Sequence, residues 1–129
     1  MRASRDELPL LFGAEPASVR GADWGGLRAI IVSLPAGADL GPLFKGLPND
    51  RCSCPHWGYV IRGRMRITYA DREEVVSAGD VVYMPPGHTG VVEEDFEWAE
   101  FSPPAEHNTV LEVVRRNAAT SPLEKGDSE

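Results

Sequence analysis

The sequence has few cysteines, no long apolar run and no excess of positive charge, and each shortage excludes a class of protein. No apolar stretch approaches the roughly 18–20 residues that a membrane-spanning helix requires. Lysine and arginine together number 13, against 20 aspartates and glutamates, so the formal net charge is −7. Nucleic acids and anionic membrane surfaces attract clustered basic side chains. We therefore expect neither of them as a partner.

The two cysteines, Cys52 and Cys54, are separated by a single residue. On a strand both side chains would point to the same face, with Cα atoms near the upper limit for an unstrained disulfide. A structural disulfide is therefore not expected, which suits a reducing compartment. The first residues include Asp6 and Glu7 and lack the apolar stretch of a secretory signal. These features together predict a cytoplasmic location.

Length and composition predict a single domain. With 129 residues, of which 42% are apolar, the chain can bury one hydrophobic core but not two. No internal repeat, low-complexity tract or linker divides it. We expect a barrel core at about residues 27–102, a helix at about 103–117 and a frayed tail at 118–129.

Short segments rich in β-branched and aromatic residues recur along the chain, separated by glycine, proline and aspartate. Segments of this kind at intervals of roughly 8–12 residues indicate an all-β sandwich or barrel. We count roughly eight strands; the clearest segments are 27–34, 52–62, 64–69, 73–77, 81–84, 89–93 and 96–101. Gly63 is expected to separate two strands of a hairpin.

One helix is predicted near the end of the chain. Apolar residues recur there at helical spacing, namely Val110, Leu111, Val113 and Val114. Ser102 would cap the helix, a proline would occupy its first turn, and Asn117 would end it. His107 lies among polar residues, so we expect it on the solvent side.

Two segments resemble the paired motifs of the cupin family. The second family pattern, G-x5-P-x-G-x2-H-x3-N, is met in GDVVYMPPGHTG by Gly79, Pro85 and Gly87. The first pattern is H-x-H-x3-4-E-x6-G. Anchoring its final glycine on Gly63 places His56 at the glutamate position and Cys52 at the second histidine position.

The resemblance covers about residues 27–102 and is strongest to small single-domain cupins with a CPHWGYV and PPGH signature. It implies an all-β fold, the cupin double-stranded β-helix or jelly-roll barrel, followed here by a short C-terminal α-helix. It also implies a homodimer and a site inside the barrel. No defined reaction comes with this signature.

The residue types at the family's metal-ligand positions are exchanged in this sequence. Gly90 stands where the second motif has its histidine, but His88 would share its face on an extended strand. Cys52, Cys54 and His56 alternate along one predicted strand in the same way. We predict that Cys52, Cys54, His56 and His88 converge inside the barrel, as a donor set suited to zinc, iron or nickel.

A metal-free protein is an equally open alternative, because buried cysteines and histidines are common without a metal. In either case we expect a small organic molecule as the ligand, in a pocket that includes Arg62, Tyr83, Met84 and Trp98. The protein would then be a metal-dependent binding protein or enzyme, or a ligand-binding sensor module without catalysis. A purely structural role through the outer sheet is a third possibility.

Overall fold

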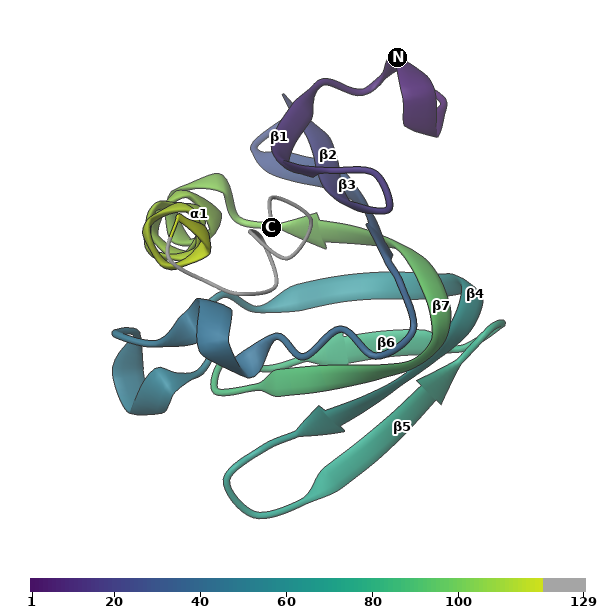
Figure 1. Cartoon of the computed structure of the whole chain (residues 1–129). Coiled ribbons are helices and arrows are strands. Elements are labelled where there is room, and N and C mark those ends of the chain that lie inside the picture. The colour runs from purple at the N-terminus through teal and green to yellow at the C-terminus, as the bar shows by residue number, and fades with distance from the viewer. Residues whose placement is uncertain (120–129) are drawn as a thin grey trace.

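Seven antiparallel strands dominate the computed structural model of this chain, which describes residues 1–119. The strands are β1 (Leu10–Ala14), β2 (Ala17–Trp24), β3 (Leu27–Leu34), β4 (His56–Thr68), β5 (Glu73–Ser77), β6 (Val81–Met84) and β7 (Thr89–Ser102). Three short 3-10 helices, η1 (Arg5–Glu7), η2 (Gly41–Phe44) and η3 (Pro48–Asp50), and one α-helix, α1 (Pro104–Ala118), complete the described part (Figure 1).

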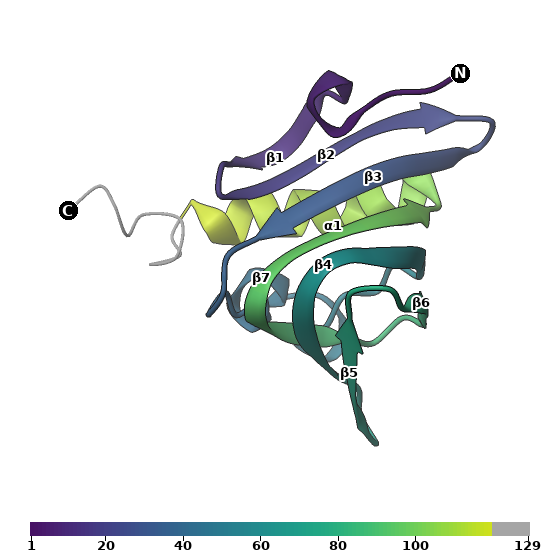
Figure 2. The same ribbon diagram turned by 90° about the vertical axis from the view of Figure 1, so that its right-hand side faces the viewer.

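The two long strands, β4 and β7, bend and pair with different neighbours along their lengths. The first half of β4 pairs with β6 and with the end of β7, while its second half pairs with β5 and with the start of β7. Along its other edge, the second half of β7 pairs with β3, and the sheet continues from there through β2 and β1. The sheet therefore folds over its own inner face (Figures 1 and 2). This arrangement confirms the predicted all-β jelly roll with a C-terminal helix.

The bend in β4 lies at Gly63, whose φ is 87°. A Cβ at this position would lie 2.0 Å from the carbonyl oxygen of Asp95 in β7, so the close approach of the two strands requires glycine. The register between β4 and β7 shifts on both sides of this point, as in a β-bulge. The hairpin predicted at Gly63 is therefore wrong: pairing with β7 continues through the bend and keeps β4 a single strand.

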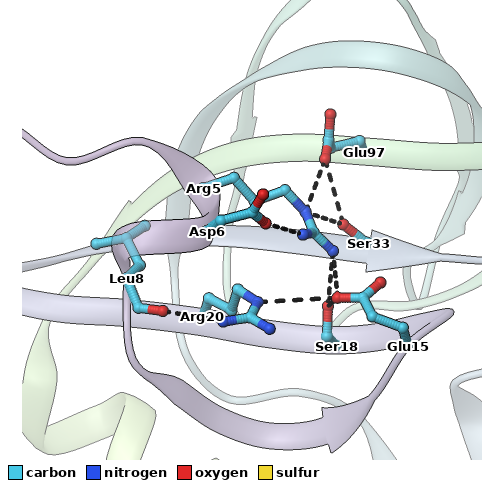
Figure 3. A network of polar contacts seen from close by, with 8 residues as sticks. All are labelled: Arg5, Asp6, Leu8, Glu15, Ser18, Arg20, Ser33 and Glu97. Atoms are coloured by element: carbon cyan, nitrogen blue, oxygen red, sulfur yellow. Dashed lines mark hydrogen bonds and ion pairs between the residues drawn. The ribbon is translucent and has the colours of Figure 1, made fainter.

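A hairpin of β1 and β2 extends the sheet at its N-terminal edge, before residue 27, where the barrel core was expected to begin. Arg5 fastens the turn of this hairpin to the sheet. Its guanidinium bonds Glu15, lies 3.1 Å from Ser33 Oγ of β3 and pairs with Glu97 of β7 at 3.1 Å (Figure 3). The hairpin is thus joined to two other strands by side chains as well as by backbone pairing.

Helix α1 lies along one face of the sheet, beside β3 and the end of β7 (Figures 1 and 2). Its buried residues pack against η2 and the segment before β4, in a cluster of Leu43, Phe44, Leu47, Cys52, Cys54, Val110, Val113, Val114 and Ala118. The N-cap is Pro103, without a side-chain bond, and not Ser102 as expected. From residue 120 onward, the tail predicted to fray lies outside the described residues. Within residues 1–119, the helices are too short or too polar to cross a bilayer.

Candidate functional site

A cavity of about 460 Å³ lies inside the barrel, between the sheet and α1. Its walls are mostly apolar and include Met65, Ile67, Met84, Phe96, Trp98 and Leu111. Its titratable side chains include three histidines, one thiol and one buried glutamate, namely His56, His88, His107, Cys52 and Glu100. A volume of this size is typical of small-molecule sites.

Three of these side chains converge on one point. One donor atom from each of Cys52, His56 and His88 lies within 4.8 Å of the others. His56 begins β4, whereas Cys52 precedes β4 and His88 precedes β7. An isolated β-bridge joins Cys52 to His88, with the Cys52 N–H donating to the His88 carbonyl at 2.8 Å. The structure thus brings together three of the four predicted metal ligands.

Hydrogen bonds orient both histidine rings. His88 Nδ1 lies 2.8 Å from the Pro85 carbonyl, which can only accept, so this nitrogen carries a proton. His56 Nδ1 lies 2.7 Å from the Glu100 carboxylate and 2.7 Å from Ser102 Oγ. In both rings Nε2 is therefore the nitrogen that faces the point where the three side chains converge. His56 Nε2 lies 3.6 Å from Cys52 Sγ. Metal-binding histidines are typically held by partners of this kind.

Glu100 is the buried acid of the site. It accepts from Trp98 Nε1 at 2.9 Å and from Ser102 Oγ at 2.8 Å, in addition to its contact with His56. Burial raises its pKa, but the charge and hydrogen bond of His56 outweigh this effect and hold the pKa at about 2. Conversely, burial lowers the pKa of His56, and the Glu100 charge raises it well above its usual value. The pair is therefore ionised in the metal-free protein.

The two cysteines differ sharply in their surroundings. Burial raises the Cys52 pKa, but hydrogen bonds and charge from His56 and His88 bring it down to about 6. Cys54 is fully buried, its Sγ lies 3.4 Å from the Pro55 carbonyl, and burial raises its pKa. Both thiols are free, as expected. Cys54 lies beside His56 but outside the group of three converging donors.

His107 is buried at 6% exposure and lines the cavity, so its predicted place on the solvent side is wrong. Its Nδ1 lies 3.0 Å from Arg28 Nη1, and Arg28 is held in turn by Asp23 at 2.6 Å. Burial lowers the His107 pKa to about 4. A neutral imidazole on α1 therefore faces the same cavity as the three converging donors.

Two of the four predicted pocket residues, Met84 and Trp98, line the cavity. Tyr83 points the other way, because side chains alternate along β6. It is 51% exposed and stacks on Trp57 with ring centroids 5.2 Å apart. Arg62 is also exposed, and it lies near the bulge at Gly63 on the outside of the barrel. The expectation that Tyr83 and Arg62 line the pocket is thus corrected.

Sequence reasoning missed Glu100, Ser102 and His107. The alternation of the last strand contained a signal for the first two, because Glu100 and Ser102 follow Trp98 at intervals of two and share its buried face. His107 lies three residues before Val110, on the apolar stripe of α1.

Comparison with known proteins bears on the fold and on the segment that carries the site. The family model for the cupin domain matches residues 51–93, which include Cys52, His56 and His88. No curated protein matches the sequence significantly.

Among solved structures, apo-HppE is similar with a TM-score of 0.56 and 14% identity, over 79% of this chain and 57% of that chain. The iron(II) form of HppE gives 0.56 and 13%, over 79% and 59%. KdgF from Halomonas sp. gives 0.55 and 23%, over 78% of this chain and 92% of that chain. An RmlC-like cupin from Shewanella frigidimarina gives 0.55 and 16%, over 78% and 88%. This chain spans little more than half of HppE, and at these identities the likeness concerns the fold alone.

Proposed function

We propose that this chain is a member of the cupin superfamily, whose domain model matches residues 51–93, and that its barrel binds a divalent transition metal through Cys52, His56 and His88, beside a small organic ligand. The observation that carries the proposal is the convergence of three donor atoms within 4.8 Å, on the wall of a cavity of about 460 Å³. A protein of the same fold, HppE, has an iron(II) form.

The donor set fits such an ion. One thiolate and two imidazoles suit zinc, iron or nickel, and three protein ligands leave a coordination position open. Glu100 and the Pro85 carbonyl hold the protons on the outer nitrogens of His56 and His88, so Nε2 is the nitrogen of each ring that would bind the metal. Cys54, whose thiol neighbours His56, stays a predicted additional donor.

In this proposal, different residues of the cavity have different roles. A bound metal would supply Lewis-acid or redox chemistry at its open position. Glu100 fixes the His56 ring, and the apolar walls, Phe96 among them, exclude water from the ligand. His56 must release its Nε2 proton before that nitrogen can act as a ligand, so metal and proton compete for the same atom.

Metal analysis of protein purified without a histidine tag tests the proposal. We expect about one equivalent of a transition metal per chain after soaking with zinc, iron or nickel, because the three donors form one site. Cys52→Ala should lose the metal, whereas Cys54→Ala is the matched control and should lose less. Less than about a tenth of an equivalent in the parent protein after soaking would overturn the proposal.

A metal-free ligand-binding or sensor module is the second candidate function. It is favoured by the pairing of the ionised His56 with Glu100 and the Cys52 thiolate, which satisfies these charges without a metal. A ligand that binds only the folded state raises the melting temperature. Stabilisation by small organic molecules, and none by zinc, iron or nickel, would favour this candidate over the first.

The homodimer expected from the resemblance is also a proposal. Large apolar side chains are exposed together on the outer face of β4, β6 and β7: Trp57, Tyr59, Val81, Tyr83 and Phe101. Exposed patches of this kind mark association surfaces, and a two-fold dimer pairs one patch with its own copy. Sedimentation should give a dimer that Tyr83→Glu dissociates, whereas a monomeric parent protein would contradict the proposal.

A further inference from the structure

His107 is a polar group of the cavity that the proposed metal site does not use. It belongs to the first turn of α1, whereas Cys52, His56 and His88 belong to the sheet or to loops next to it. Its ring centroid lies 6.4 Å from that of His56, and both side chains line the same cavity. A group at this place can contact a ligand that sits beside the metal.

The partner of His107 fixes which of its nitrogens carries the proton. Arg28 Nη1 lies 3.0 Å from His107 Nδ1, and a guanidinium can donate a hydrogen bond but not accept one. Nδ1 is therefore the acceptor. Arg28 is itself held by Asp23 at 2.6 Å and by Asn108 at 2.8 Å, so this geometry is supported from two further sides. The proton of the neutral ring must be on Nε2.

This Nε2–H has no acceptor among residues 1–119. A donor that faces the cavity without a protein acceptor can form a hydrogen bond to an acceptor on a bound molecule. Burial also keeps the His107 pKa low, so the ring is neutral and donates from a single nitrogen near pH 7. His107 Nε2 is therefore a directed hydrogen-bond donor of the cavity wall, as is the Thr89 hydroxyl, whose buried Oγ1 also lacks a partner among the described residues.

The charges around the cavity indicate what kind of oxygen this is. Arg28 is paired with Asp23 at 2.6 Å, and the described residues that line the cavity include the acids Glu15 and Glu100 but no arginine or lysine. The wall therefore offers no permanently charged cation to bind an anionic group. The remaining wall is mostly apolar, with Met65, Ile67, Phe96, Leu111 and Val114, and it also includes Ser18 and Thr89.

We propose that the cavity takes a mainly apolar carbonyl compound, whose oxygen accepts a hydrogen bond from His107 Nε2. This proposal names the ligand class for the cavity of the proposed function and rests on that function for the presence of a ligand. His107 is then the residue that selects an oxygen-bearing ligand over a hydrocarbon of the same shape.

The test uses 4-phenylbutan-2-one, labelled with ¹³C at the carbonyl, and compares the parent protein with two variants. His107→Leu removes the donor, and His107→Gln is the matched control, because an amide can accept from Arg28 and still donate into the cavity. We expect His107→Leu to bind the ketone about 3- to 10-fold more weakly, since one neutral hydrogen bond is lost. His107→Gln should stay within about 3-fold of the parent.

Infrared difference spectra measure the hydrogen bond to the ketone carbonyl directly. A merely structural role of His107 would not change the carbonyl frequency. The carbonyl stretch of the bound ketone should shift to lower frequency than in cyclohexane for the parent and His107→Gln, but not for His107→Leu. An unshifted stretch in the parent protein overturns the proposal even if His107→Leu does not fold. Absence of ketone binding, or tighter binding of 3-phenylpropanoate than of the ketone, overturns it as well.

Metal content separates this inference from the proposed function. His107→Leu should keep the metal content of the parent, because His107 is not among the three converging donors. A parent protein that binds no metal but gives the shifted carbonyl stretch refutes the metal site and supports the role of His107. A metal-loaded protein that leaves the carbonyl stretch unshifted supports the metal site and refutes the role of His107.

Discussion

An inner and an outer polar network of the barrel are built from similar groups in different surroundings. In the inner network, His56 and Glu100 have side chains exposed by 9% and 5%. In the outer network, Arg5 and Glu15 have side chains exposed by 28% and 50%. A buried ion pair gives little net stability over an apolar replacement, whereas an exposed pair is worth about 0–1 kcal/mol. Stability alone therefore explains neither network.

The two networks differ in what they position. The inner one holds the His56 ring so that Nε2 faces Cys52 Sγ. The outer one fastens the turn of the β1–β2 hairpin to β3 and β7, and the Glu15 and Ser18 side chains of that turn also line the cavity (Figure 3). The comparison indicates that the buried network fixes the position of a ring in the candidate site, whereas the exposed network attaches a segment of the sheet.

The largest expected effect comes from breaking the inner network at Glu100. Glu100→Ala should lower the free energy of unfolding by about 3–5 kcal/mol, because it leaves a buried cation and two buried donors without their acceptor. Urea unfolding followed by tryptophan fluorescence measures the change. Glu100→Gln retains an acceptor and should lose less. A loss below about 1 kcal/mol for Glu100→Ala would show that the inner network resembles the outer one.

A second prediction concerns the stability of the folded protein at low pH. Because the folded-state pKa of Glu100 is about 2, below the ordinary value of 4.5, its contribution is complete above pH 4.5 and is lost as the pH falls toward 2. At ~1.4 kcal/mol per pKa unit, the difference between 4.5 and about 2 makes the full loss on the order of 3–4 kcal/mol. Glu100→Gln should flatten this acid limb in thermal melts at pH 2–5. Glu15→Gln, in the outer network, should leave the limb nearly unchanged, and equal flattening by both would refute the contrast.

The sequence predicts the jelly roll well, because turn residues such as Gly79, Pro85 and Gly87 stand between short apolar segments. It could not distinguish a turn from a bulge at Gly63, since both use a glycine with positive φ and only pairing with β7 decides between them. The β1–β2 hairpin was missed because β1 has no clear alternation and Gly13 interrupts it.

Cys52 and His56 could be predicted because motif and alternation agreed there, and His88 from alternation alone, since the motif has its histidine at Gly90; the structure brings the three together. The site could not be predicted where a polar residue stands at a position that the pattern makes buried, or where a buried residue has polar neighbours in the sequence. Glu100 alternates with Trp98, but a carboxylate at a buried position is expected only when its partners are known. His107 lies between two polar neighbours on α1, and its role depends on Arg28, 79 residues away.

A third prediction uses the inner network to separate the two cysteines. At pH 7 iodoacetamide should modify Cys52 at least about tenfold faster than Cys54, because the thiolate is the reactive form and the Cys52 pKa is about 6. Mass spectrometry of the two peptides measures the rates. Zinc should protect Cys52 if it binds there, while Cys54→Ser serves as the control that leaves the fast reaction in place. Equal rates would mean that His56 and His88 do not activate the thiol.

The smallest expected effect comes from the outer network. Arg5→Ala should lower the free energy of unfolding by no more than about 1 kcal/mol, because its partners Glu15 and Glu97 stay solvated after the change. The turn of the β1–β2 hairpin also lines the cavity. Without Arg5, this turn is no longer fastened to the sheet, so the backbone amides of the hairpin should exchange hydrogen faster than in the parent protein. Hydrogen-exchange mass spectrometry of residues 10–24 measures this. Faster exchange confined to the hairpin, with the melting temperature nearly unchanged, would show that the outer network acts as an attachment; a global loss of protection would show that it supports the whole barrel.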